Sequence, residues 1–90
     1  MSLNNDQIED FKEIDKILWY NWDPMGINKM DEARDEYYPY LQEVFRLRSE
    51  NVEIETIAQY LNKIEKEIME LPGNIKNCRL VAECILEIGT

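Results

Sequence analysis

The chain has 90 residues and a mass of 10.8 kDa, which suffices for one small domain over residues 1–90, since a second hydrophobic core would need a longer chain. Nineteen Asp and Glu residues against ten Lys and Arg residues give a net charge of −9. A chain this acidic is repelled by nucleic-acid phosphates and by anionic lipid, so we expect neither nucleic acid nor a membrane as partner. The absence of histidine excludes His-based acid–base catalysis and most zinc sites.

The features that bear on the cellular compartment indicate the cytoplasm. No apolar run reaches the roughly 18 residues of a membrane-spanning helix, and Met1–Phe11 lacks the basic and apolar regions of a signal peptide. On one helix, Cys78 and Cys84 would have Cα atoms roughly 9 Å apart, beyond the limit of about 7 Å for a disulfide. We therefore expect two reduced thiols, buried or half-buried. Residues 1–5 are expected to be frayed.

The first predicted helix runs from about Asp6 to Trp22. Asn4 or Asn5 can accept the free N–H groups of its first turn. Its apolar residues recur at steps of three or four, as on one face of an amphipathic helix: Ile8, Phe11, Ile14, Leu18 and Trp22.

The sequence Asp23-Pro24-Met25-Gly26 should end this helix, because its order of residues suits a type I turn. A proline disfavours the helical conformation of the preceding residue, so we expect an extended backbone at Asp23. Its carboxylate should then bond the N–H groups of Met25 and Gly26. Residues 27–34 are predicted to be a connection.

The second predicted helix runs from about Asp35 to Arg48. Pro39 lies inside this range, and a proline is tolerated only in the first turn of a helix. We therefore expect Asp35 to be the N-cap. The helical pattern rests on Tyr37, Tyr40, Leu41, Val44 and Phe45.

Two further helices are predicted, one from about Glu53 to Glu70, ended by Pro72-Gly73, and one capped by Asn74 and ending near Gly89. No stretch alternates with period two, so we expect an all-α fold, a compact four-helix bundle-like domain with a long, aromatic-flanked loop between its first two helices. The predicted core consists of Phe11, Leu18, Leu41, Val44, Ile57, Leu61, Ile64 and Ile85.

Sequence motifs for catalysis, metals and cofactors are missing. The acidic residues from Asp31 to Glu36 fail the spacing of a calcium loop, and we interpret them as a solvated helix start. Glu65, Glu67 and Glu70 alternate with lysines, which is typical of a solvated face. No hydroxyl or thiol has a recognisable base, and no glycine-rich phosphate loop is present. The sequence thus predicts neither a catalytic site nor a metal nor a cofactor.

Aromatic residues are the remaining signal, because they flank both ends of the predicted loop. One interpretation is a recognition patch, since Trp and Tyr dominate binding hot spots. The other is a small core that holds the loop against the helices, with Tyr20 or Tyr38 facing outward. Candidate residues for either role are Trp19, Trp22, Asp23, Pro24, Gly26, Asp35, Tyr37 and Tyr40.

The pattern Trp22-Asp23-Pro24-Met25-Gly26-Ile27, with Asp35-Glu36-Tyr37 and Ile57-Ala58-Gln59-Tyr60-Leu61, resembles the YugE-like family of small helical bacterial proteins. The likeness extends from about Asp6 to Leu86. Met25 stands where isoleucine is commoner, and Pro39 is unusual within its helix. The resemblance implies an all-α fold and brings no catalytic residue.

Three functions remain open at this stage. The first is a non-enzymatic interaction module, whose acidic surface would suit a basic protein partner; one concrete form is an immunity or antitoxin-type inhibitor of a basic nuclease. The second is self-association into a structural homodimer. The third is a small-molecule or metal site at the aromatic and acidic loop.

Overall fold

The computed structural model describes residues 3–89, and within that range it contains four α-helices and no strand. This confirms the predicted all-α fold. The α-helices are α1 (Asn5–Ile17), α2 (Tyr38–Ser49), α3 (Ile54–Lys63) and α4 (Ile75–Leu86). Three shorter segments complete them: the π-helical turns η1 (Leu18–Trp22) and η3 (Ile64–Ile68) and the 3-10 turn η2 (Asp31–Ala33).

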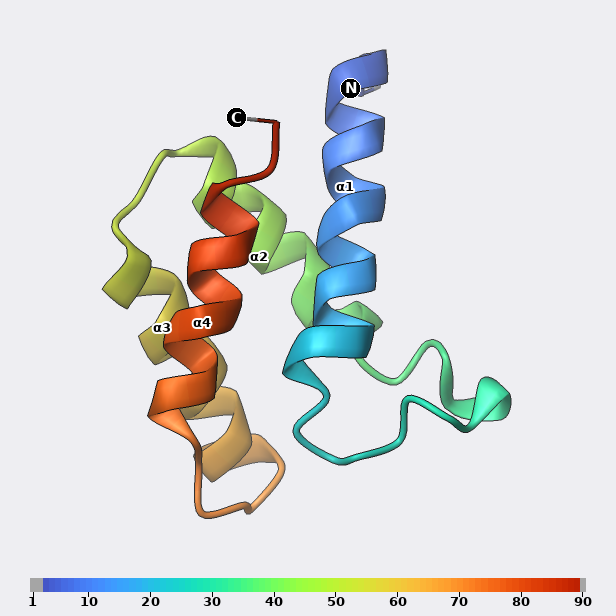
Figure 1. The fold of residues 1–90 in the computed structure, drawn as a ribbon, viewed down its shortest axis with the longest axis vertical. Helices are drawn as coiled ribbons and strands as arrows, with labels where there is room; N and C mark the ends of the chain where they lie inside the picture. Colours follow the sequence, from blue (N-terminus) through green and yellow to red (C-terminus); the bar gives the residue numbers. More distant parts are fainter. Residues whose placement is uncertain (1–2, 90) are drawn as a thin grey trace.

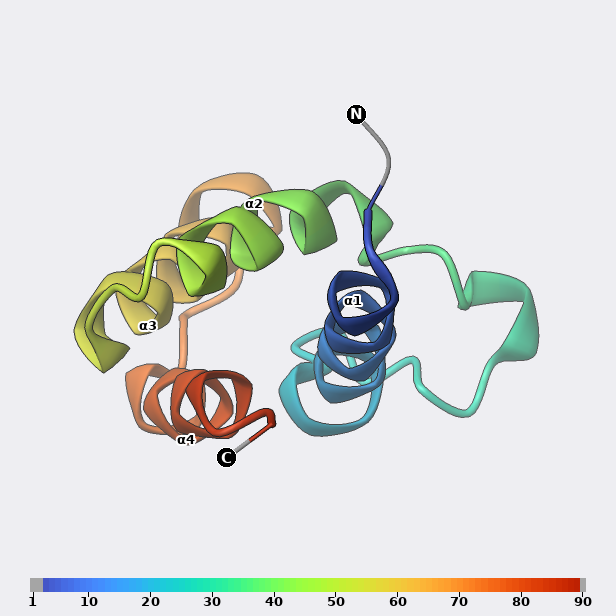
Figure 2. The same ribbon diagram turned by 90° about the horizontal axis from the view of Figure 1, so that it is seen from above.

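The helices surround one core, with α3 and α4 packed side by side and α1 next to α4 (Figures 1 and 2). α2 crosses from α1 to α3 and contacts both. The connection between η1 and α2 projects away from this body in both views (Figures 1 and 2). Arg48 of α2 joins three helices, since its Nη1 donates to Asp10 Oδ2 at 2.8 Å and its Nε to the carbonyl of Ile85 at 3.1 Å.

The first helix begins earlier than expected. Asn4 Oδ1 accepts from the N–H of Gln7 at 2.8 Å, and Gln7 Oε1 accepts from the N–H of Asn4 at 2.9 Å. This reciprocal capping box satisfies two N–H groups at the helix start, so order begins within the predicted frayed segment. Residues 1 and 2 lie outside the described range.

The core contains seven of the eight residues predicted for it. The exception is Phe11, which is half-buried because it lies at the surface between α1 and α2, where its ring meets Phe45 edge-on at 5.4 Å. The prediction for the cysteines is half right, since Cys78 is buried and Cys84 is exposed, both as free thiols. Among the described helices, none combines the length and apolar character needed to cross a membrane.

The second helix begins later than predicted, at Tyr38, with Tyr37 at the N-cap. Asp35 is exposed and does not cap the helix with its side chain; its carbonyl accepts from the N–H of Tyr38 in a preceding turn at 3.1 Å. The reason is Pro39, which has no N–H and therefore lies at the very start of the helix.

Candidate functional site

Two helices end in the same uncommon way. α1 continues into η1, where the N–H of Asp23 bonds the carbonyl of Leu18 at 3.0 Å. α3 continues into η3, where the N–H of Met69 bonds the carbonyl of Ile64 at 3.0 Å. These bonds span five residues instead of four, and such π-type turns are frequent at functional sites. The chain then leaves each turn through a left-handed residue, Asp23 at φ 28° or Glu70 at φ 57°. The predicted extended backbone at Asp23 is therefore wrong, because its N–H closes the π-helical turn.

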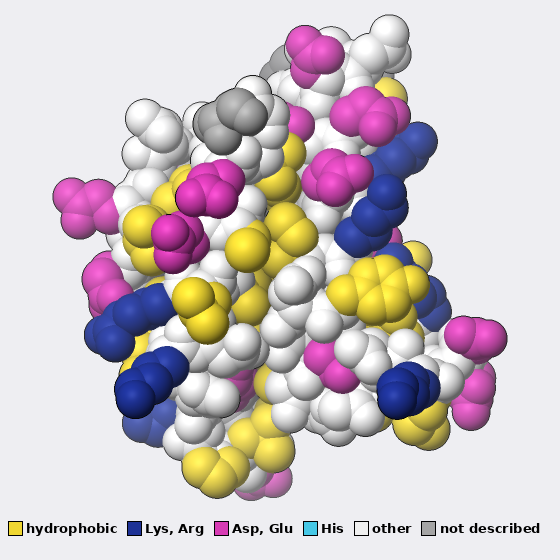
Figure 3. Space-filling model, viewed as in Figure 1, with side chains coloured by type: hydrophobic (Ala, Val, Ile, Leu, Met, Phe, Trp, Pro, Cys, Tyr) yellow, Lys and Arg dark blue, Asp and Glu magenta, His cyan; other side chains and the backbone are white. Residues whose placement is uncertain are grey.

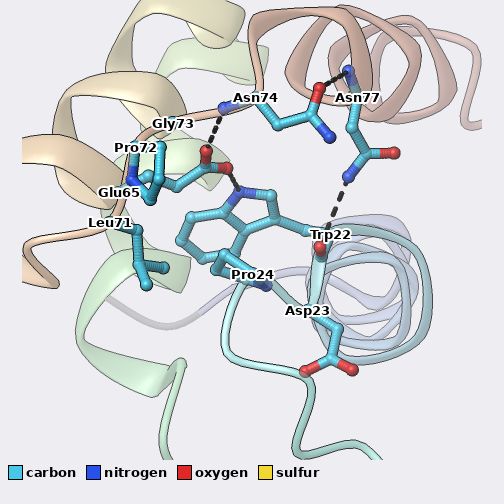
Figure 4. A pocket seen from close by; sticks show the side chains of 9 residues that line it. All are labelled: Trp22, Asp23, Pro24, Glu65, Leu71, Pro72, Gly73, Asn74 and Asn77. Carbon is cyan, nitrogen blue, oxygen red and sulfur yellow. Dashed lines mark hydrogen bonds between the residues drawn. The ribbon is translucent and has the colours of Figure 1, made fainter.

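A pocket of about 280 Å³ lies where these two helix ends meet (Figure 4). Trp22 and Pro24 contribute from the first end, and Glu65 with the start of α4 from the second. The complete lining consists of Trp22, Asp23, Pro24, Leu71, Pro72, Gly73, Asn74, Asn77 and Glu65. Only Trp22, Asp23 and Pro24 of this lining were among the candidate site residues predicted from the sequence.

Glu65 is the central polar group of the pocket and is 3% exposed. Its Oε2 accepts from the indole Nε1 of Trp22 at 2.7 Å and from the Sγ of Cys78 at 3.1 Å, while Oε1 accepts from the N–H of Asn74 at 2.7 Å (Figure 4). The interpretation of Glu65 as solvated is wrong, because this one carboxylate joins η1, η3 and the start of α4.

The remaining polar groups around Glu65 also bond within the chain. The side-chain amide of Asn77 donates to the carbonyl of Trp22 at 3.4 Å, and Asn74 Oδ1 accepts from the N–H of Asn77 at 3.1 Å, which caps α4. Burial, followed by the hydrogen bond to Glu65, raises the pKa of the Cys78 thiol to about 12. Cys78 is therefore a neutral hydrogen-bond donor at neutral pH and a poor nucleophile.

Asp23 organises the turn that follows η1. Its Oδ1 accepts from the N–H of Ile27 at 2.8 Å and from the phenol of Tyr37 at 2.7 Å, and its Oδ2 accepts from the N–H of Asn28 at 3.3 Å. The predicted acceptor role is right, whereas the predicted partners, Met25 and Gly26, are not. The reason is that the left-handed backbone turns the carboxylate further along the chain.

A β-turn forms at the expected residues, since the N–H of Gly26 bonds the carbonyl of Asp23 at 3.1 Å. Gly26 has a positive φ of 64°, and a Cβ there would meet nothing within 4 Å. The phenol oxygen of Tyr37 accepts from the N–H of Met25 at 3.2 Å. Burial, followed by the hydrogen bond to Asp23, raises the pKa of Tyr37.

The four predicted ring residues form an aromatic cluster, namely Trp19, Trp22, Tyr37 and Tyr40. The Tyr37 ring lies 5.9 Å from that of Trp19 and 5.2 Å from that of Trp22, and Tyr40 packs edge-on against Trp22 at 5.9 Å. Trp19, Trp22 and Tyr37 are each at most 3% exposed. The geometry therefore agrees with a small core that holds the loop, rather than with a recognition patch.

Arg34 attaches the far part of the loop to α1. Its guanidinium donates to both oxygens of Asp15 at 2.9 and 2.8 Å and lies 5.0 Å above the ring of Trp19. Such a bidentate pair fixes orientation as well as distance. The projecting loop is thus held at Asp23, Arg34 and Tyr37.

The outer side of the loop is acidic. Asp31, Glu32, Asp35 and Glu36 lie in the segment 29–36, here called the acidic loop, and all four are exposed. None of them forms an ion pair with a basic residue in the described part of the chain. Figure 3 shows acidic side chains at the tip of the projecting loop, with basic side chains beside them. Two tyrosines next to the loop, Tyr20 and Tyr38, face outward, as predicted.

Glu65 and Arg34 are the functional residues that the sequence reasoning missed. A signal for Glu65 was present, because it follows Ile57 and Leu61 at steps of four and so continues the apolar face of the helix. No local pattern distinguishes Arg34, whose partner is 19 residues away. Across residues 3–89, no three Cys, Asp or Glu side chains converge as a metal site.

No protein-family model, no curated protein and no solved structure matches this chain. The resemblance to the YugE-like family therefore stays a prediction, and we infer function from the geometry of the site.

Proposed function

We propose that this chain is a small interaction module without catalytic activity that binds a basic partner protein through its acidic loop. The observation that carries the proposal is the set of four exposed carboxylates without an ion pair on a segment that projects from the body. Charges on the rim of an interface steer partners together and select among them. The whole chain has a net charge of −9, so residues outside the loop add to that attraction.

The attachment of the loop supports this role. Asp23, Tyr37 and the Arg34–Asp15 pair hold the segment in one arrangement before any partner arrives. A preformed surface binds with a smaller loss of conformational entropy than a flexible one. The pocket at Glu65 supports a structural role, since its polar side chains already bond within the chain. A cytoplasmic location fits the two free thiols and belongs to the same proposal.

The test uses a fluorescent peptide of lysine and serine as a defined basic probe, with binding followed by anisotropy at low and at moderate salt. The loop variant carries Asp31→Asn, Glu32→Gln, Asp35→Asn and Glu36→Gln. The control variant has the same net charge but is changed at exposed carboxylates elsewhere: Glu9→Gln, Glu13→Gln, Glu67→Gln and Glu83→Gln.

We expect the loop variant to bind the probe about tenfold more weakly than the parent chain, and the control variant to change affinity by less than about twofold. Added salt should weaken binding to the parent more than to the loop variant. Equal affinities of the two variants would show that overall charge, rather than the acidic loop, attracts the probe.

A further inference from the structure

A second surface feature lies between α1 and α2, and it shares no lining residue with the pocket of Figure 4. It is a mainly apolar groove of about 560 Å³, which falls within the roughly 300–1,000 Å³ of many ligand sites. Leu41 is buried at 5% exposure, whereas Leu3 and Tyr38 are 41% and 49% exposed. The lining consists of Leu3, Phe11, Lys12, Asp15, Tyr38, Leu41, Gln42 and Phe45.

The groove is continuous with the acidic loop through two residues of its own lining. Asp15 binds Arg34 of the loop through both carboxylate oxygens, and the N–H of Tyr38 bonds the carbonyl of Asp35 at 3.1 Å. One end of the groove therefore opens beside the exposed carboxylates. Lys12, the basic residue in the lining, has Glu9 at 3.8 Å as its partner.

We propose that the groove binds an amphipathic helix with a basic face, supplied by the partner protein. Apolar side chains of that helix enter the groove, and its lysines or arginines lie over the acidic loop. The inference rests on the proposed function and specifies the partner that it requires. Helix-in-groove recognition places anchors at positions i, i+3, i+4 and i+7. The α2 side of the groove runs from Tyr38 to Phe45, a separation of seven positions or roughly 10 Å, which matches that spacing.

Charge selects this occupant over two others. A second copy of the chain brings its own net charge of −9 to a groove that already ends in unpaired carboxylates. An anionic lipid surface is repelled in the same way. A basic amphipathic helix supplies both the apolar surface that covers the groove and positive charge for the four loop carboxylates that form no ion pair.

The experiment uses a labelled amphipathic peptide of leucine and lysine, a scrambled peptide of the same composition, and a leucine–glutamate peptide with the same apolar pattern. We expect the parent chain to bind the first peptide at least about tenfold more tightly than either of the others. Circular dichroism should show that the bound peptide becomes helical.

Matched variants locate the binding. Gln42→Lys places a cation in the groove, and Gln59→Lys makes the same charge change on exposed α3 surface. Tyr38→Ala removes exposed lining, and Tyr20→Ala removes a tyrosine that is 63% exposed outside the lining. Each groove variant should weaken binding of the leucine–lysine peptide by about tenfold, and each control by less than about twofold.

The outcomes separate the two proposals. If both groove variants bind the peptide as the parent does while the neutralised loop variant binds it weakly, the groove inference is wrong and the proposed function stands. If the loop variant and its charge-matched control bind the lysine–serine probe equally, the proposed function fails. A dimer in light scattering that Gln42→Lys dissociates would show that a second copy occupies the groove, and would overturn the inference.

Discussion

α1 and α3 both end in a π-helical turn, and the two turns differ in the carboxylate that lies beside them. After η1, Asp23 accepts three hydrogen bonds from groups 4, 5 and 14 residues further along the chain. Within η3, Glu65 accepts three from Trp22, Asn74 and Cys78, which lie 43, 9 and 13 residues away. Asp23 is half-buried, whereas Glu65 is buried.

The hydrogen bonds of Asp23 hold one loop together, whereas those of Glu65 join elements that are distant in the sequence. Asp23 closes the loop that follows it, and because Asp23 is half-buried, water can replace some of the hydrogen bonds that it accepts. Glu65 accepts from η1 and from the start of α4, and two of its donors, the indole of Trp22 and the thiol of Cys78, are buried where water does not reach them readily. The free-energy loss on removing a buried acceptor includes the desolvation of the donors left behind, so Glu65 should matter more for stability.

The largest expected effect is that of Glu65→Ala. The change leaves the indole N–H of Trp22 and the thiol of Cys78 buried without their acceptor, so the free energy of unfolding should fall by about 3 kcal/mol. Urea denaturation measures this value. Glu67→Ala, at an exposed position in the same turn, is the control and should change stability by less than about 0.5 kcal/mol. Equal effects would contradict the central role of Glu65.

The next effect is that of Asp23→Ala, with an expected loss of about 2 kcal/mol. The change removes the acceptor of Tyr37 and places alanine at a left-handed backbone position. Loosening of the aromatic cluster should shift tryptophan fluorescence to longer wavelength. Asp35→Ala, at an exposed loop residue, should leave both signals unchanged. A silent Asp23→Ala would show that the turn holds without its side chain.

The two glycines of these helix ends sharpen the comparison. A Cβ at Gly73, where φ is 87°, would lie 2.7 Å from Asn62 Oδ1 and 2.9 Å from Lys66 Cγ, whereas a Cβ at Gly26 meets nothing within 4 Å. Gly26→Ala therefore costs only its backbone strain, about 1 kcal/mol. Gly73→Ala should cost about 1 kcal/mol more, since the neighbours must also shift. Thermal unfolding of the two variants gives the difference, and an equal cost would rule out tight packing at Gly73.

The smallest effect concerns alkaline pH. Because the pKa of Cys78 rises from its ordinary 9.0 to about 12 on folding, the folded chain keeps this proton while the unfolded chain releases it. The resulting stability is complete below pH 9 and is lost as the pH rises towards 12. Between pH 8 and pH 9.5 the parent should lose about 0.8 kcal/mol more than Cys78→Ser, which keeps a donor for Glu65. Parallel pH profiles from urea denaturation would contradict this coupling.

The structural features that depend on residues close together in the chain could be predicted from the sequence. The apolar spacing located the core of α3 and α4, and the Asp23-Pro24-Met25-Gly26 turn was visible because its residues are adjacent. The start of α2 was misplaced because the sequence favoured Asp35 as a cap without showing that the helix begins at Tyr38, directly before Pro39. Glu65 was missed for another reason, since its burial depends on a tryptophan 43 residues away. Local patterns do not report such pairings.

The hydrogen bond between Trp22 and Glu65 also bears on the order in which contacts can form while the chain is being synthesised. A ribosome adds Trp22 to the chain 43 residues before Glu65, the acceptor of its buried indole N–H. Until then, α1 and the turn at Asp23 lack the contact that joins them to η3, and bringing together such distant partners costs loop-closure entropy. The nascent chain therefore completes this joint only after the third helix has emerged. A fragment that stops before Glu65 leaves the indole N–H of Trp22 without that acceptor. Truncation within α3 should therefore destabilise α1 and its turn as well as the truncated helix.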